Sequence, residues 1–322
     1  MLKEVEAGSV PYRILLFKRF EGFGPGLAAV AQESPKLREL LCYLLVFRDR
    51  LHHREILASA LWPESTSVQS RKYLRQALWR LRALTDSDAV PLLRAENEWV
   101  GVDTTCLWID ADEMEQQFMA VRTTPGEAIS DEEAGSLRDA VALYRGDLLE
   151  GWYQDWCVSE RERLKAIYLG MMDKLLAFSE RHSRIEEGLS TAERILRHNP
   201  TSERTYVRLM RLYYLAGDRT TALRQFSLCN TVLRDELGIE PAEQTRRVYE
   251  QIRDDRGVEA VAGLGRLVRA KPESSANGGQ FPPKGAEGIY TALERLRQSL
   301  ADAVLVLDQS MRELLQQGPD AV

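Results

Sequence analysis

The most informative segment of the chain is Ser65–Thr85, STSVQSRKYLRQALWRLRALT. It contains five basic residues and no acidic residue, although the whole chain has a formal net charge of −6. At 100° per residue, one side of a helix here carries Ser70, Leu74, Ala77, Leu78 and Leu81. The opposite side carries Lys72, Arg75, Gln76, Trp79 and Arg80, flanked by Arg71 and Arg82. The pattern predicts a helix that buries one face and is typical of a recognition helix in a DNA groove.

A basic helix face is in most proteins only a solvated surface. Two features favour nucleic acid here. Trp79 stands among the charges, where a solvated face needs no large aromatic side chain. Gln69 and Gln76 add amide groups, which can pair with the edge of an adenine.

Two helical patterns precede this segment. Apolar residues recur at spacings of three and four from Leu37 to Leu45, and Ser34 and Pro35 are suited to the N-cap and the first helical position. A second, shorter helix is expected at about His53–Leu61, where Pro63 ends it. Helix, short helix, turn and basic helix together predict a helix-turn-helix core.

Short strands are expected on both sides of this core. Tyr12–Phe17 and Phe20–Phe23 precede it, and Val90–Arg94 and Glu98–Val102 follow it as a hairpin in the position of a wing. The hairpin offers Arg94 and Asn97 to DNA. It also carries Glu96 and Glu98, which repel phosphate, so we expect the wing to add little affinity.

From these residues onward the chain resembles the Streptomyces antibiotic regulatory proteins and their relatives. The resemblance rests on a series of phrases in a fixed order: LASALWPE, LRQALWRLRAL, DAVALYRGDLLEGW (Asp139–Trp152), ERERL (Glu160–Leu164), HNPTSERTYVRLMRLYYLAGDRTTALRQF (His198–Phe226) and RDELGIEP (Arg234–Pro241). It covers about residues 10–253. It implies a winged helix of the response-regulator type, followed by a bacterial transcriptional activation domain, and it implies recruitment of RNA polymerase.

The region from Asp110 to Arg253 is helical in periodicity almost throughout. Gly188 and Gly217 fall where small residues let paired helices approach, as in tetratricopeptide-like repeats. Gly238 should end one helix before a last helix that contains Tyr249 and Ile252. Such repeats present a curved surface to other proteins. A generic helical domain is the alternative.

The C-terminal region adds a feature of its own. Residues 254–288 are expected to hold a short helix and a flexible linker rich in Pro, Gly and Ser. Residues 289–317 then predict one amphipathic helix. Its apolar stripe is formed by Leu293, Leu296, Leu300, Val304, Leu307, Met311 and Leu314, with Ile289 at its start. We expect this stripe to mediate a homodimer through a coiled coil or bundle, and the alternative is that it folds back on the repeats.

Composition limits the remaining function classes. No stretch is long or apolar enough to span a membrane, and the four cysteines lack metal-ligand spacing, so a cytoplasmic protein with reduced thiols is expected. There is no phosphate-loop motif, and we expect neither an enzyme, a metal site nor a cofactor. His52 and His53 are interpreted as helix-start residues near phosphate. Asp110, Asp112, Glu113 and Glu115 are interpreted as the solvated start of a helix.

The predicted fold is therefore mainly α, in four parts. Residues 10–104 form a winged helix-turn-helix (α+β), residues 110–253 form an all-α tetratricopeptide-like domain, and residues 254–288 and 289–317 form the linker and the C-terminal amphipathic helix. The predicted function is a sequence-specific transcriptional regulator, an activator by resemblance, that binds double-stranded promoter DNA. The predicted contacts are Gln69, Arg71, Lys72, Arg75, Gln76, Trp79, Arg80 and Arg82, with Arg54, Arg94 and Asn97 at the periphery.

Two rival functions stay open. The helical domain or the C-terminal helix could sense a small-molecule effector, such as a nucleotide second messenger, through the arginines of Arg204–Arg211 and Arg246–Arg253. Alternatively, the protein could be an adaptor whose winged helix contacts protein rather than DNA, as the acidic wing suggests.

Overall fold

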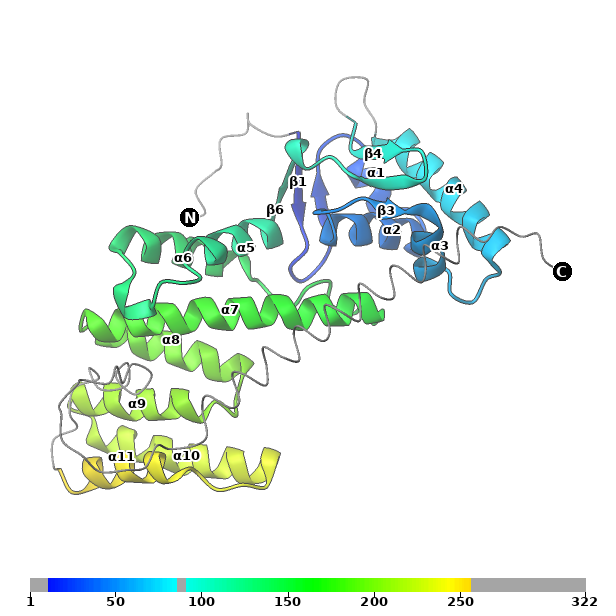
Figure 1. Cartoon of the computed structure of the whole chain (residues 1–322). Coiled ribbons are helices and arrows are strands. Elements are labelled where there is room, and N and C mark those ends of the chain that lie inside the picture. The colour runs from blue at the N-terminus through cyan, green and yellow to red at the C-terminus, as the bar shows by residue number, and fades with distance from the viewer. Residues whose placement is uncertain (1–10, 86–90, 256–322) are drawn as a thin grey trace, which may run out of the picture. The chain divides into compact units, whose positions relative to one another are not determined.

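The computed structural model describes residues 11–85 and 91–255, and within them the predicted fold class is confirmed (Figure 1). The N-terminal part contains, in chain order, β1 (Tyr12–Leu15), β2 (Glu21–Phe23), α1 (Leu27–Ala31), α2 (Pro35–Val46), β3 (His52–His53), α3 (Arg54–Leu61), α4 (Ser67–Thr85), β4 (Leu93–Glu96), β5 (Trp99–Val102), a 3₁₀ turn (Thr104–Cys106) and β6 (Leu107–Ile109). The helical part contains α5 (Asp110–Ala120), a second 3₁₀ turn (Gly126–Ala128), α6 (Asp131–Leu143), α7 (Asp155–Arg181), α8 (Ile185–His198), α9 (Glu203–Leu215), α10 (Arg219–Leu237) and α11 (Glu243–Arg253).

Two small sheets frame the helices of the N-terminal part. In the first, β1 lies between β2, which it pairs antiparallel, and β6, which it pairs parallel. In the second, β5 lies between β3 and β4, and both pairs are antiparallel. The β4–β5 hairpin is the predicted wing. Strand β1 therefore joins the start of the chain to the strand that leads directly into α5.

The helix-turn-helix core forms for the reasons that its sequence suggests. The side chain of Ser34 caps α2 by accepting from the Leu37 backbone N–H, and Pro35 occupies the first position. Helix α3 ends at Leu61, before Pro63. Helix α4 buries Ser70, Leu74, Leu78, Leu81 and Thr85, while Ala77 is partly buried, so the predicted stripe is confirmed.

The interpretation as helix-start residues holds for His53, which is the N-cap of α3, and is wrong for His52. Both lie in β3, which pairs with β5 in the register His52 to Val100. The His52 ring is buried, its Nε2 lies 3.0 Å from the Phe47 carbonyl oxygen, and burial lowers its pKa. His52 is therefore a neutral structural residue, and only His53 of the pair is partly exposed.

Helices α7 to α11 pack in sequence as antiparallel neighbours (Figure 1). A Cβ at Gly188 would lie 3.1 Å from the Leu212 Cδ1, so this glycine permits close approach of α8 and α9. Gly238 ends α10 in the left-handed conformation with φ 67°, as predicted. Gly217, with φ 82°, makes the turn between α9 and α10. The free cysteines Cys42, Cys106, Cys157 and Cys229 are all buried.

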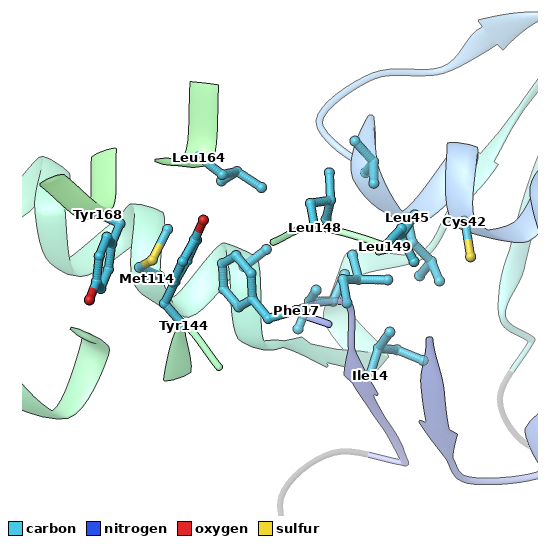
Figure 2. Packing of buried hydrophobic residues seen from close by; sticks show 14 of the residues in the cluster. Ile14, Phe17, Cys42, Leu45, Met114, Tyr144, Leu148, Leu149, Leu164 and Tyr168 are labelled. Carbon is cyan, nitrogen blue, oxygen red and sulfur yellow. The ribbon is translucent and has the colours of Figure 1, made fainter. Parts of the chain in front are cut away.

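The two parts share one hydrophobic core. Beyond β1, Phe17 forms a β-bridge with Leu148, which lies in the loop between α6 and α7. The Phe17 and Tyr144 rings are 4.9 Å apart, and Tyr144 in turn stacks on Tyr168 at 4.2 Å (Figure 2). All described residues lie within one compact unit.

The acidic cluster at the start of α5 is not the solvated surface that we predicted. Asp110 is 1% exposed and accepts backbone N–H bonds from Leu16 and Phe17, at 2.8 and 3.2 Å, and from Ala111. Asp112 and Glu115 both bind the Arg48 guanidinium, at 2.5 and 2.8 Å. Asp110 is buried, and Asp112 and Glu115 are partly buried. All three carboxylates bind groups of the N-terminal part, so they connect the two parts electrostatically.

Asp110 should make stability depend on pH. Burial raises the pKa of its carboxyl to about 6, against the opposing effect of the three N–H donors and of Arg145. An unfolded Asp has a pKa of about 3.9, so between about pH 4 and pH 6 the folded chain holds a proton that the unfolded chain has released. This contribution to the free energy of unfolding therefore declines as the pH rises through that window, by about 2–3 kcal/mol.

The measurement is urea unfolding of the wild type and of Asp110→Asn, which does not titrate, at several pH values. The wild-type free energy of unfolding, minus that of the variant, should fall between about pH 4 and pH 6. A difference that stays constant with pH would show that Asp110 titrates at the same pH in both states.

The C-terminal predictions lie outside the described residues. These are nearly all of the 254–288 segment and the whole 289–317 helix with its proposed dimerisation stripe. In the part that the structure describes, no helix is long and apolar enough to cross a membrane.

Candidate nucleic-acid interface

The predicted contact residues of α4 lie together on its exposed face. All of Gln69, Arg71, Lys72, Arg75, Gln76, Trp79, Arg80 and Arg82 are exposed. The Trp79 side chain is 70% exposed, an unusual state for the largest apolar side chain. The face exists because the buried stripe from Ser70 to Thr85 fixes the rotation of α4 against the core. Helix α4 packs most closely against α3, its partner in the helix-turn-helix (Figure 1).

The cations on this face differ in their surroundings. Lys72, Arg75 and Arg82 form no ion pair within the described residues. Arg71 lies 3.3 Å from a Glu55 oxygen, in a pair whose side chains are both about half exposed. Arg80 donates to Glu33 from Nε at 2.9 Å and from Nη2 at 2.5 Å. The unpaired cations give α4 a local excess of positive charge that the acidic chain as a whole lacks.

Gln69 has a structural task that its predicted role did not include. The Thr66 backbone N–H donates to the Gln69 Oε1, and the Gln69 backbone N–H donates to the Thr66 Oγ1, both at 3.4 Å. This reciprocal arrangement is a capping box, which the spacing Thr-x-x-Gln would have revealed. The side-chain oxygen of Gln69 is therefore already used at the start of α4.

The peripheral residues lie around this face in different states. The Arg54 backbone N–H donates to the Glu98 carbonyl at 2.8 Å, so the start of α3 is hydrogen-bonded to the wing. The Arg54 side chain is partly buried. Asn97 forms the tip of the wing with φ 48°. Arg94 is exposed but lies 2.6 Å from a Glu96 oxygen, which offsets its charge.

Trp99 is a surface aromatic residue that the sequence reasoning did not select. It is 47% exposed on β5 and meets the His53 ring edge-on at 5.3 Å. Its position directly after the turn residues Asn97 and Glu98 is the signal that could have identified it. Trp99 and His53 place an aromatic pair on the wing sheet, beside the start of α3.

The arginines considered for a phosphate ligand are largely engaged within the protein. Arg208 is buried and donates to both Glu180 oxygens, at 2.8 and 2.6 Å, and to Asp173 at 2.6 Å. Arg204 lies 3.6 Å from the same Asp173. In the second stretch, Arg247 pairs with Glu243 and Arg253 with Asp254. These carboxylates neutralise charge that a phosphate ligand would require.

Comparison with known proteins agrees with this architecture. Residues 109–253 match the family model of the bacterial transcriptional activator domain. The regulatory protein AfsR of Streptomyces coelicolor is 25% identical over 275 residues, which are 85% of this chain and 26% of AfsR. The transcriptional regulatory protein MoaR1 of Mycobacterium bovis is 24% identical over 258 residues, which are 76% of this chain and 80% of MoaR1.

The fold is also similar to that of a solved structure. EmbR of Mycobacterium tuberculosis, solved in complex with a low affinity phosphopeptide, matches with a TM-score of 0.60 at 19% identity, over 81% of this chain and 71% of EmbR. The chain spans about a quarter of the length of AfsR. Residues 109–253 therefore contain a bacterial transcriptional activator domain, and the domain match and the relatives support a transcriptional regulator that resembles the Streptomyces antibiotic regulatory proteins.

Proposed function

We propose that the protein is a transcriptional activator that binds promoter DNA in a sequence-specific manner through α4. The observation that carries this proposal is the exposed face of α4. There Lys72, Arg75 and Arg82 form no ion pair within the described residues, and they stand beside the exposed Gln76 and Trp79. A guanidinium or an amide can read base edges in the major groove, and cations at the flanks can hold phosphates.

Each group has a proposed role on the duplex. Lys72, Arg75, Gln76 and Arg80 contact bases and phosphates, and Trp79 packs on a sugar or a thymine methyl group. Arg71 and Arg82 contact the backbone on either side. Arg54, Arg94 and Asn97 lie at the periphery, and the Arg94–Glu96 pair supports a small contribution from the wing.

The remaining parts of the proposal rest on the domain match and on the C-terminal sequence. We infer that the helical repeats contact RNA polymerase, because the matched domain is named for transcriptional activation. We also infer a homodimer on repeated half-sites, held through the stripe between Leu293 and Leu314.

The test is selection of bound fragments from a random DNA pool with the purified full chain. We expect a recurring motif. The logarithm of the binding constant for this motif should fall linearly with the logarithm of the salt concentration, with a slope of about −0.9 for each phosphate that α4 neutralises. Because α4 offers five cations, this slope should be modest for each recognition helix. The absence of any enriched motif at low salt would contradict the proposal and favour an adaptor that acts through protein contacts.

A further inference from the structure

Glu33 lies outside the predicted interface, yet it contacts the recognition helix. It follows α1 and immediately precedes the N-cap of α2, and its backbone N–H donates to the Val30 carbonyl at 3.1 Å. Its carboxylate Oε1 accepts two bonds from Arg80, from Nε at 2.9 Å and from Nη2 at 2.5 Å. The Glu33 side chain is 24% exposed and the Arg80 side chain 50% exposed, so the pair lies at the solvent edge of the proposed DNA surface.

The contact occupies the part of Arg80 that an anion from DNA would use. The Nε and Nη2 groups form one edge of the guanidinium, and this edge binds carboxylate and phosphate with the same geometry. While Glu33 holds this edge, a phosphate must displace a carboxylate or approach a neutral pair. The Glu33 carboxylate, once displaced, would remain near the duplex and repel its backbone.

The other ion pair on α4 offers a comparison. Arg71 reaches Glu55 through one contact of 3.3 Å between side chains that are about half exposed. A pair with this geometry contributes little free energy in water. Glu33 differs because two donors converge on one oxygen at shorter distances, so it should withhold its arginine more effectively.

We propose that Glu33 is an internal competitor for DNA phosphate: it withholds Arg80 in the free protein and thereby lowers affinity for DNA of any sequence. The inference rests on the proposed DNA binding by α4. By lowering the affinity of the basic helix α4 for all DNA, the Glu33–Arg80 pair would limit indiscriminate binding. A phosphate or base must be well placed to exchange with the carboxylate, whereas a poorly placed one cannot.

The test compares Glu33→Gln with the wild type on a duplex of arbitrary sequence and on the selected motif. We expect Glu33→Gln to bind the arbitrary duplex about two- to fivefold more tightly, as an exposed pair of this kind implies. The log–log salt slope should steepen by about 0.9, the value of one additional phosphate contact. The gain on the selected motif should be at least as large, because wild-type binding there must break the whole Glu33–Arg80 pair and the variant has no pair to break.

A double-mutant cycle shows whether the effect passes through Arg80. In an Arg80→Ala background, the gain from Glu33→Gln should be clearly smaller than in the wild type, since the group that Glu33 withholds is gone and only the repulsion by its carboxylate remains. Glu55→Gln is the matched control, because it removes the same charge from the other flank of α4. A gain of equal size in both backgrounds, or an equal gain with Glu55→Gln, would reduce the effect of Glu33 to general charge and overturn the inference.

The outcomes separate this inference from the proposed function. If the wild type binds DNA and Glu33→Gln binds equally or more weakly, Glu33 supports Arg80 rather than competing for it, and only the inference fails. If the wild type and all variants fail to bind DNA at low salt, the proposed function fails and the inference fails with it. Circular dichroism spectra that match the wild type establish that each variant is folded.

Discussion

Replacing Arg75 and Arg80 together by alanine is expected to reduce affinity for the selected DNA by about 100-fold or more, because loss of each well-placed contact costs about 1–3 kcal/mol. Both side chains are exposed, and neither belongs to the buried stripe that holds α4 in place. The variant should therefore retain the wild-type thermal unfolding midpoint while losing specific binding. Fluorescence anisotropy on a labelled duplex measures the affinity.

A matched control separates local contacts from the change in net charge. Arg224→Ala with Arg247→Ala removes the same charge from exposed positions on α10 and α11, in the helical part. This control should bind DNA within about twofold of the wild type, because exposed charges beyond the screening length of about 8–10 Å contribute little. Unchanged affinity of the Arg75/Arg80 variant would remove α4 from the DNA interface.

Asp110→Ala is expected to lower the free energy of unfolding by about 3–5 kcal/mol, since it leaves three buried N–H groups without their acceptor. Those groups belong to Leu16, Phe17 and Ala111, so the loss affects the end of β1 and the start of α5 at once. The measurement is urea unfolding at pH 5, below the raised pKa of about 6 for this carboxyl. There the carboxyl is mostly protonated, and no buried charge offsets the loss.

The number of unfolding transitions is as informative as the loss of unfolding free energy. Because the two parts share one core, fluorescence and circular dichroism should report a single transition for both the wild type and Asp110→Ala. Asp112→Ala is the control, because Asp112 is 34% exposed and Arg48 keeps Glu115 as a partner. It should cost about 1 kcal/mol. Two separate transitions, or equal losses for both variants, would refute the role that we give to Asp110.

Periodicity was sufficient to predict the larger elements. The spacing of leucines fixed α2, and a rotation of 100° per residue correctly divided α4 into a buried stripe and an exposed face. Gly217 and Gly238 marked real helix boundaries because both need a left-handed backbone. These features depend on neighbours within a few residues, and a single sequence contains that information.

The errors arose where partners are distant in sequence. Asp110 looks like a solvated helix start until Leu16 and Phe17, more than 90 residues earlier, meet it. The two-residue β3 exists only because β5 pairs with it. Helix α1 was not predicted, since five residues have no clear period, and its position depends on packing of Leu27 and Val30.

In the candidate site too, features that depend on neighbouring residues were predicted, and features that depend on distant partners were not. The residues on the exposed face of α4 followed from helical geometry, and their role on DNA stays a prediction. The acids that hold Arg71 and Arg80 come from α3 and from the segment before α2, so spacing within α4 could not reveal them. The capping box of Gln69 was readable from four adjacent residues, and was missed because its amide suggested base recognition.

The pairing of β1 with β6 has a consequence for any attempt to isolate the N-terminal part. A fragment that stops near residue 104 would lack β6, Asp110 and Leu148, and would expose one edge of β1 together with Phe17. An unpaired strand edge beside bare aromatic surface invites aggregation. The smallest self-sufficient piece of this protein therefore extends at least through Tyr168, whose ring stacks on Tyr144, the ring that packs against Phe17.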